Sequence, residues 1–384
     1  MSARTIATLE RLVGFDTTSR NSNLPLIAWV EEELARFGVP SFRVYDETGE
    51  KANLFATIGP ADVPGYILSG HTDVVPVDGQ DWASDPFTLT RRGSRLYGRG
   101  TSDMKGFVAC CIAKLPELVA QPLKMPIHFS FSYDEEVGCL GVPGLVSELA
   151  GRPVLPAGCF VGEPTSMQVV VSHKTKRSFN VRVQGRSCHS SLAPEGVNAV
   201  EYAARLIVFI RELGVKLRDQ GPRDGLFDVP FTTAHTGTIE GGTVLNIVPD
   251  QCVFSYEFRV LPREDADALS AAVEAYARDV LEPEMKAIAP EAGFTFEAVT
   301  GFPGLDTAVE APVTLLAKRL AGRNDHSKVA YGTEAGIFEG GGIPTVVVGP
   351  GSIEQAHKPD EFIEIAELER CEAFIDRLIA HCAA

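Results

Sequence analysis

Residues 66–73 have the sequence YILSGHTD, in which an apolar run ends in a histidine and an aspartate. Residues 66–69 have the length and composition of a buried β-strand. Such strands are typical of parallel sheets covered by helices, and an open α/β sheet places its site at the carboxyl ends of its strands. The sequence therefore predicts that His71 and Asp73 lie at a functional edge of an α/β sheet.

The length and hydropathy of the chain indicate a compact protein with more than one domain. Its 384 residues exceed an ordinary single domain, and 45% of them are hydrophobic, which is enough for substantial cores. No stretch reaches the roughly 18–20 consecutive apolar residues of a membrane span. The first residues, MSARTIATLERLVGF, lack the basic and apolar regions of a signal peptide. We therefore expect a cytoplasmic protein without a membrane partner.

The charge balance and the cysteines argue against further classes. Asp and Glu number 51 against 35 Lys and Arg, a balance that disfavours nucleic acid and anionic membranes as partners. The eight cysteines form no CxxC pair and no framework spacing, so we expect buried free thiols rather than disulfides.

The first part of the chain alternates between helical and strand periodicity, which predicts an α/β layer with mostly parallel strands. The expected helices lie at 5–14, 26–37, from about 105, and near 142–150. The expected strands lie at 53–58, 66–69, 127–133 and 159–163.

The pattern changes after residue 176. A β-α-β-β-α-β succession follows, typical of a small α+β sandwich inserted into a larger domain. Its elements are expected at 178–184, 198–213, 233–239, 251–260, 264–281 and 294–299, before the α/β pattern returns with a helix at 311–321, a strand at 344–349 and a helix at 366–380. We therefore predict one domain formed by residues 1–176 and 301–384, and an inserted domain at 177–300.

Isolated acids and histidines near the predicted strand ends form the ligand set of a two-metal centre. Histidine nitrogen and carboxylate oxygen are zinc donors, and a catalytic zinc needs about three protein ligands. Asp103, in a Gly-rich turn before a helix, is expected to bridge the ions. We assign His71 and Glu163 to the first ion, and Glu136 and His357 to the second. Cobalt and manganese accept the same ligands, so two Zn²⁺ ions are expected with Co²⁺ or Mn²⁺ as substitutes.

Two further acids, Glu135 and Asp73, have separate interpretations. Adjacent residues that leave a strand point in opposite directions, so Glu135 is expected to face the water as general base while Glu136 binds metal. Asp73 is expected to orient His71, because a metal-bound histidine usually donates its second N–H to a carboxylate. The alternatives are a solvated acidic turn for residues 134–136 and an ordinary loop acid for Asp73.

Five motifs in succession resemble one known family of hydrolases. They are HTDVVP (71–76), GRGTSDMKG (98–106), DEEVG (134–138), GEPT (162–165) and QAHKPDE (355–361). Together they resemble the family of acetylornithine deacetylases, succinyl-diaminopimelate desuccinylases and glutamate-releasing carboxypeptidases. Any one motif is weak evidence, but five in order over nearly the whole chain are specific.

The resemblance implies a fold and an assembly. Members of this family have a zinc-peptidase-like catalytic domain with two zinc ions, interrupted by a lid and dimerisation domain, which agrees with the change of pattern after residue 176. It implies a homodimer and the same ligand and base assignments as above. One departure is Thr175, where many relatives have glycine, and this puts the choice of substrate in doubt.

The resemblance also implies residues that bind the substrate. GRSCHSS (185–191) is similar to a lid segment whose histidine helps to hold the oxyanion in the partner subunit's site, which points to His189. Asn246, within GGTVLNIVP (241–249), and Arg259 match positions that bind a substrate carboxylate, for which the planar arginine fork is suited. Glu334, within GTEAG (332–336), is expected to pair with an ornithine ammonium. A strand-end histidine and a surface arginine remain the alternatives for His189 and Arg259.

The expected activity is hydrolysis of an N-acyl amino acid, with N2-acetyl-L-ornithine as first candidate. A water activated between the two metal ions attacks the amide carbonyl, and Glu135 transfers its proton to the leaving amine. The alternatives are a deacylase for acetylcitrulline or succinyl substrates, a two-zinc dipeptidase or aminopeptidase, and an inactive metal-binding protein. A serine or cysteine hydrolase is disfavoured because the sequence has no GxSxG elbow.

Overall fold

The computed structural model describes residues 3–384, which form two compact units. The first unit runs up to Ser172 and includes Leu305–Lys328 and Thr333–Ala384, and the second comprises His173–Gly304 and Val329–Gly332. The expected boundaries were residues 176 and 301. The short segment 329–332, which was expected in the first domain, belongs to the second unit.

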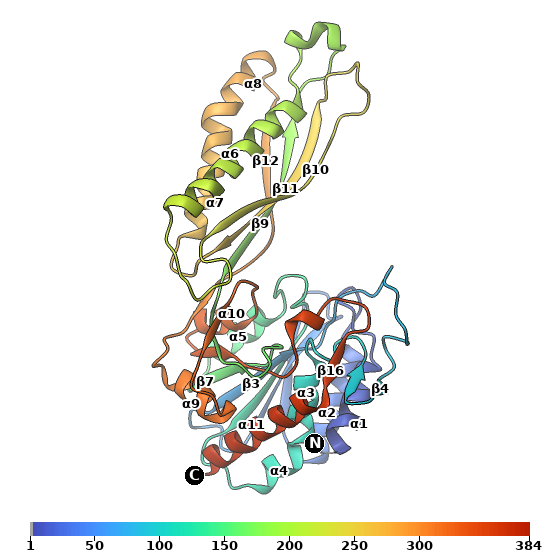
Figure 1. Cartoon of the computed structure of the whole chain (residues 1–384), viewed down its shortest axis with the longest axis vertical. Coiled ribbons are helices and arrows are strands. Elements are labelled where there is room, and N and C mark those ends of the chain that lie inside the picture. The colour runs from blue at the N-terminus through green and yellow to red at the C-terminus, as the bar shows by residue number, and fades with distance from the viewer. Residues whose placement is uncertain (1–2) are drawn as a thin grey trace. The chain divides into compact units, whose positions relative to one another are not determined.

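A nine-stranded sheet forms the centre of the first unit (Figure 1). Its order is β1–β2–β6–β3–β7–β15–β8–β13, and β14 pairs with β8. β3 runs parallel to β6 and β7, and β15 runs parallel to β7, whereas β1, β2 and β8 pair antiparallel with their neighbours. The four central strands are therefore parallel, and the predicted α/β class is confirmed. The strand bounds are β1 Ser41–Tyr45, β2 Ala52–Ile58, β3 Tyr66–His71, β6 Ile127–Ser132, β7 Gly158–Val161, β8 Val170–His173, β13 Leu305–Asp306, β14 Ser327–Val329 and β15 Thr345–Val347.

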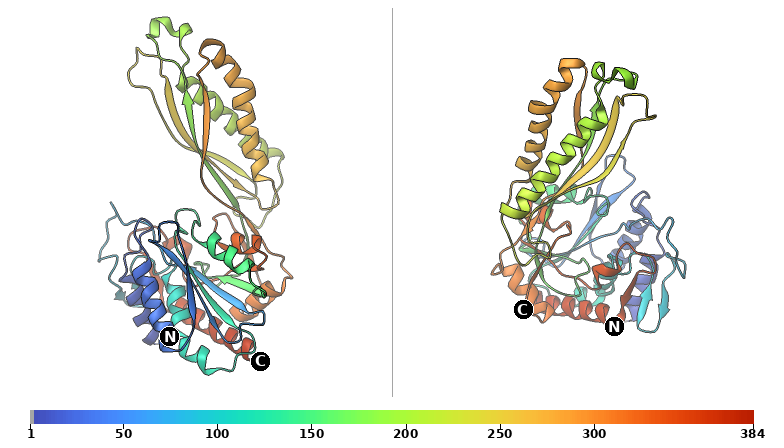
Figure 2. Two further views of the ribbon diagram at one scale, coloured as in Figure 1. Left: turned by 180° about the vertical axis from the view of Figure 1, so that it is seen from behind. Right: turned by 45° about the horizontal axis from the view of Figure 1, so that its top comes forward.

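Helices pack around this sheet (Figures 1 and 2), and α3 (Lys105–Ala113) is the most enclosed of them. It contacts β3, α1 and α11. Its sequence KGFVACCIA is apolar on nearly every side, and every residue of the helix is buried. The other helices are α1 Ala3–Val13, α2 Leu24–Arg36, α4 Leu115–Ala120, α5 Val142–Ala150, α9 Pro312–Ala321, α10 Ala335–Gly340 and α11 Ile365–Ala383. A small sheet of β16 (Phe362–Glu364), β5 (Arg95–Tyr97) and β4 (Thr90–Arg92), and a 3₁₀ turn at Ile353–Gln355, were not predicted.

The second unit is a four-stranded antiparallel sheet with helices packed on it (Figure 1). The sheet order is β10–β11–β9–β12. Alternate residues of β11 are buried against the helices, so this strand has the expected period of two. The bounds are β9 Thr175–Gln184, α6 Ala199–Gln220, β10 Thr233–Gly241, β11 Gln251–Val260, α7 Ala266–Tyr276, α8 Glu282–Ile288 and β12 Gly293–Phe302, with a 3₁₀ turn at Ser190–Glu195. The predicted β-α-β-β-α-β order is confirmed.

Two helices of this unit are longer than predicted. The helix expected at 198–213 continues to Gln220. The helix expected at 264–281 reaches Ile288 through a π-helical turn at Ala277–Leu281, which joins α7 to α8. Both begin where a side chain caps them, since Asn198 accepts the backbone N–H groups of Val200 and Glu201, and Asp265 does the same for α7.

Two expectations for the whole chain can be compared with the described residues. None of their helices is long and apolar enough to cross a membrane. All eight cysteines are free, and every one except Cys188 is buried, as predicted. Burial raises the pKa of the Cys110 and Cys111 thiols well above the ordinary value, so these thiols stay protonated.

Candidate active site

The predicted ligands of the first unit come together where the central strands end. His71 is the last residue of β3, and Glu163 lies two residues beyond β7, which runs parallel to β3. Glu135 and Glu136 follow β6, the other parallel neighbour of β3. Because parallel strands end at the same edge of a sheet, segments far apart in sequence place their side chains in one space.

Glycine at residue 162 lets the helix behind the site approach closely. A Cβ at this position would lie 2.1 Å from the ring of Phe107, which belongs to α3. Only glycine fits there, so α3 packs directly below the segment that carries Glu163. The turn that precedes α3 carries Asp103, and the same helix therefore places this acid beside the strand ends.

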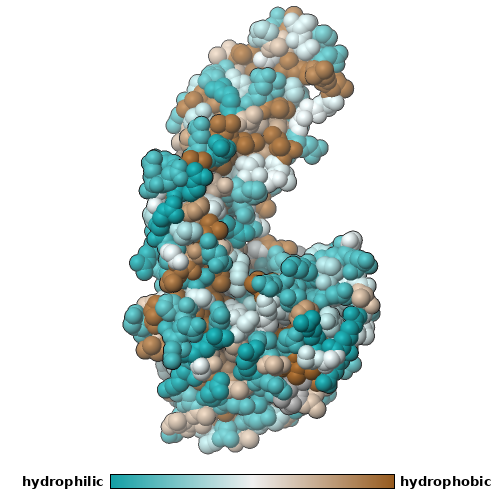
Figure 3. Space-filling model, viewed as in Figure 1, coloured by the Kyte–Doolittle hydropathy of each residue, from teal (hydrophilic) through white to brown (hydrophobic). Residues whose placement is uncertain are grey.

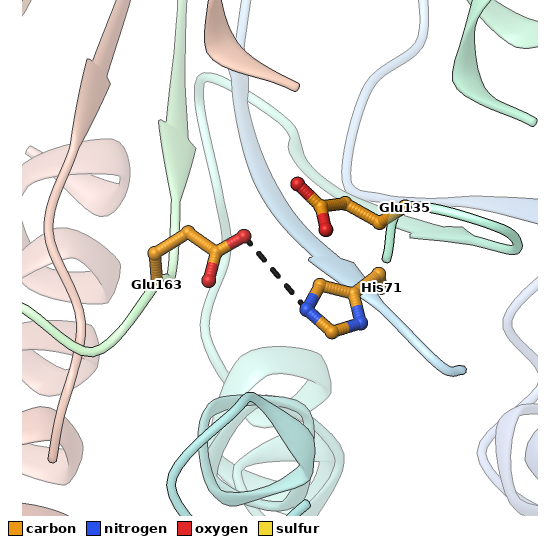
Figure 4. Close-up of side chains that lie close together, drawn as sticks. All are labelled: His71, Glu135 and Glu163. Carbon is orange, nitrogen blue, oxygen red and sulfur yellow. Dashed lines mark ion pairs between the residues drawn. The ribbon is translucent and has the colours of Figure 1, made fainter. Parts of the chain in front are cut away.

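The side chains of His71, Glu135 and Glu163 face one another (Figure 4). Their ligand atoms lie within 4.8 Å of each other, and the Nε2 atom of His71 is 3.8 Å from Oε1 of Glu163. The same Nε2 atom is 3.0 Å from Oδ1 of Asp103. His71 also belongs to a second candidate metal-binding group, with Asp103 and Glu136.

Asp103 lies between two histidines. Its Oδ1 atom faces His71, and its Oδ2 atom is 3.4 Å from Nε2 of His357. The same nitrogen of His357 is 2.9 Å from Oε2 of Glu136. One carboxylate thus offers one oxygen to each half of the cluster, the arrangement expected of a bridging ligand.

Burial and crowding shift the titration of these groups. Burial raises the pKa of Glu135 and Glu163 well above the usual range, and that of Glu136 to about 7. Burial also acts to raise the pKa of Asp103, but hydrogen bonds from His357 and His71 outweigh it and hold that pKa far below its usual value.

The two histidines respond in the opposite sense. Burial lowers the pKa of His71, but its hydrogen bond to Asp103 raises it well above the usual value. Hydrogen bonds to Asp103 and Glu136 raise the pKa of His357 to about 10. The cluster therefore gathers buried carboxylates, among them Asp103, Glu136 and Glu163, whose negative charge divalent cations would balance. The donor set fits two metal ions.

Asp73 is buried and makes different contacts from those predicted. The Nδ1 atom of His71 is 2.9 Å from the backbone oxygen of Asp73 and 3.6 Å from the nearer carboxylate oxygen, so the hydrogen bond is to the backbone. The carboxylate accepts the backbone N–H groups of Glu135 at 3.1 Å and Glu136 at 3.3 Å, and the hydroxyl of Ser19 at 2.7 Å. Asp73 thus holds the turn that carries both glutamates.

Glu334 is a buried acid close enough to His71 and Asp73 to interact with their charges. It precedes α10 and is 1% exposed, and among the described residues neither of its carboxylate oxygens has a hydrogen-bond partner. Burial raises the pKa of Glu334 to about 7. Its pairing with an ornithine ammonium stays a prediction.

The remaining predicted residues belong to the second unit and lie at two ends of its sheet. His189 and Asn246 are exposed neighbours, because the N–H of Ser190 donates to the backbone oxygen of Asn246 at 2.9 Å. Arg259 is near the far end of β11, opposite Lys176, and its Nε atom donates to Glu257 at 3.1 Å. Arg259 lies eight positions along β11 from Gln251, a distance of about 26 Å in a strand. Within one unit, Arg259 is therefore not grouped with His189 and Asn246.

The sequence profile of the peptidase family M20/M25/M40 matches residues 67–381. The chain belongs to this family. Its members are hydrolases, so the prediction of an enzyme is confirmed, as is the predicted family resemblance. The acetylornithine deacetylase of Myxococcus xanthus is 34% identical over 380 residues, which cover 98% of this chain and 96% of that protein.

Solved structures of the M20 family share the fold. A metallo-carboxypeptidase of Sulfolobus solfataricus superposes with a TM-score of 0.78 at 18% identity over the full length of both chains. A dinuclear metal binding peptidase of Bacillus subtilis superposes with a TM-score of 0.65 at 13% identity, covering 98% of this chain and 97% of the other. At these identities the likeness shows the fold alone.

The sequence analysis missed the side chains that hold the ligand-bearing turns in place. Ser19 contacts Asp73, and Glu361, Arg99 and Gln80 lie between the turns of Asp103 and His357. Two of them were within the quoted motifs, Arg99 in GRGTSDMKG and Glu361 in QAHKPDE. Their opposite charges were the available signal.

Proposed function

We propose that this chain is a two-metal deacylase of N-acyl amino acids, with N2-acetyl-L-ornithine as the substrate and Zn²⁺ as the metal. The observation that carries the proposal is the buried Asp103 carboxylate, with one oxygen toward His71 and the other toward His357. The named relative from Myxococcus xanthus supports the substrate. The donor set supports the metal class, because nitrogen and oxygen ligands of this kind suit zinc.

His71 and Glu163 would hold one ion, Glu136 and His357 the other, and Asp103 both. When bound, the ions supply Lewis-acid chemistry, which lowers the pKa of a coordinated water and polarises the amide carbonyl. A backbone hydrogen bond fixes the ring of His71, so its Nε2 atom points into the cluster before any ion arrives.

Glu135 is the general base in this proposal. Its carboxylate lies with His71 and Glu163 at the cluster, and the hydrogen bond from its N–H to Asp73 fixes the backbone that carries it. Burial raises its pKa, which makes the carboxylate a stronger base toward the attacking water, and the same group then returns the proton to the leaving amine. Neighbouring Glu136 faces His357 and is left for the metal.

We propose that the chain acts as a homodimer. The strand β10 is an edge of the second sheet and is exposed along most of its length, so its backbone is open to pairing. Exposed apolar side chains occur on this unit, as Figure 3 shows for one face, and they include Val208 at 51%, Ile239 at 53% and Leu245 at 100%. In a dimer, His189 and Asn246 would bind the substrate in the partner subunit's site. Arg259 would bind the carboxylate of the substrate in the site of its own chain.

The test is a hydrolysis panel with metal-reconstituted protein. It should contain acetylornithine, acetylcitrulline, succinylornithine, and dipeptides with a free amine. We expect acetylornithine to have the highest kcat/KM and removal of metal to abolish turnover. Faster cleavage of dipeptides than of every N-acyl amino acid would reject the deacylase assignment in favour of a peptidase, and two bound ions without hydrolysis of any substrate would indicate a binding protein.

A further inference from the structure

Glu361 is a buried acid outside the candidate metal-binding groups, four residues after His357. Its two carboxylate oxygens accept a row of backbone N–H groups from the Asp103 turn. Oε2 accepts Gly100 at 2.9 Å, and Oε1 accepts Ser102 at 2.8 Å and Asp103 itself at 3.1 Å. One side chain from the His357 loop thus fixes the backbone of the proposed bridging ligand.

Arg99 completes the connection in the opposite direction. Its Nη1 atom donates to Glu361 at 2.9 Å and to the backbone oxygen of Lys358 at 3.2 Å, and its Nη2 atom donates to Gln80 at 2.6 Å. Gln80 in turn donates to the backbone oxygen of His357 at 3.0 Å. The turn of Asp103 and the loop of His357 are therefore joined through a closed set of hydrogen bonds, most of which are buried.

The backbone of the His357 loop needs this support. His357 and Asp360 have φ angles of 64° and 54°, in the left-handed region that residues other than glycine rarely adopt. Such a conformation persists only where the surroundings enforce it. The hydrogen bond from Gln80 to His357, and one from the N–H of Ala83 to Asp360, do so.

We infer that Glu361 is a positioning residue for the second metal ion, which sets the spacing of Asp103 and His357 before metal binds. This inference rests on the proposed two-metal function. The second ion, held by Asp103, Glu136 and His357, should depend on Glu361 more strongly than the first ion, held by His71, Glu163 and Asp103. These hydrogen bonds position two ligands of the second ion, Asp103 and His357, but only Asp103 among the ligands of the first.

The test is calorimetric titration of metal-free protein with Zn²⁺. The wild type is expected to bind two equivalents. In Glu361→Gln an amide NH₂ would face backbone N–H donors, and we expect one equivalent to keep its affinity while the other weakens about 10–100-fold, the usual effect of losing a group that orients ligands. Glu364→Gln is the matched control, since Glu364 lies three residues away and its side chain pairs with exposed Arg95 and Ser94. This variant should titrate like the wild type.

A second variant and a double variant make the outcome decisive. Gln80→Ala removes the near-surface end of the same connection and should weaken the same equivalent to a smaller degree, so it carries the test if Glu361→Gln does not fold. Adding Glu361→Gln to His357→Ala should cause little further loss, because both act on one ion. Two undiminished equivalents in the folded variants, or equal weakening of both, would overturn the inference. A wild type that binds fewer than two ions would instead refute the proposed function.

Discussion

The substitution Asp73→Asn tests whether one buried carboxylate holds the turn of the proposed base. Asp73 accepts hydrogen bonds from the backbone N–H groups of Glu135 and Glu136 and from Ser19. Asparagine keeps one oxygen, so in either orientation one of the two backbone N–H groups faces an NH₂. Ser19 can adapt because its hydroxyl rotates and also accepts.

The expected loss of stability follows from the number of hydrogen bonds that the substitution removes. A hydrogen bond to a charged group contributes about 1.5–3 kcal/mol, and one such bond is lost, so the free energy of unfolding of the metal-free protein should fall by about that amount. The turn then loses its anchor, and we expect kcat to fall about 10–100-fold, as for other groups that orient ligands. Urea unfolding and steady-state hydrolysis of the best substrate measure the two effects.

The matched control is Asp78→Asn. Asp78 lies five residues after Asp73 and is an exposed acid that pairs with Arg20. This control should leave kcat unchanged and should change the free energy of unfolding by no more than about 0.5 kcal/mol. A kcat for Asp73→Asn close to that of Asp78→Asn, in protein shown to be destabilised, would refute the view that Asp73 positions the turn. Unchanged stability would refute the count of hydrogen bonds.

Three further perturbations address the base, the partner subunit and pH. Glu135→Ala should lower kcat by about 10²–10⁴-fold while both metal equivalents remain, and near-normal turnover by the fully metallated variant would reject this base. Mixing Glu135→Ala chains with His189→Ala chains should restore activity in hybrid dimers, and no recovery despite measured chain exchange would count against a role in the partner's site. Because burial raises the pKa of Glu334 to about 7, its proton stabilises the folded state at low pH, and this contribution is lost as pH rises from about 4.5 to about 7. The free energy of unfolding of metal-free Glu334→Gln, measured in urea, should therefore rise by about 2–3 kcal/mol relative to that of the wild type between pH 5 and pH 8. A difference between the two proteins that stays constant over this range would contradict the raised pKa.

Much of the fold could be predicted because it depends on periodicity. The period of two in β11 and the amphipathic helix α6 follow from the sequence alone. Short strands such as β4, β5 and β16 were missed, since three residues are too few to establish a period. The π-helical turn at Ala277–Leu281 has no glycine or proline to mark it.

In the candidate site, too, some features could be predicted from the sequence and others could not. His71 and Glu163 could be located because each follows an apolar strand. The hydrogen bond of His71 to the backbone of Asp73, rather than to its carboxylate, depends on how the chain turns after β3, which residue types do not specify. The burial of Glu334 depends on the packing of segments distant in sequence, which a local pattern does not contain.

The position of β15 has a consequence for synthesis of the chain. β15 pairs with both β7 and β8, yet the whole sequence of the second unit up to Gly304 separates it from them. A chain growing on the ribosome therefore makes β7 and β8 long before the strand that joins them, whereas residues 173–304 of the second unit emerge as one continuous piece. His357 leaves the ribosome later still. The proposed metal centre therefore lacks one of its candidate ligands until residue 357 has been made, long after His71, Asp103, Glu136 and Glu163.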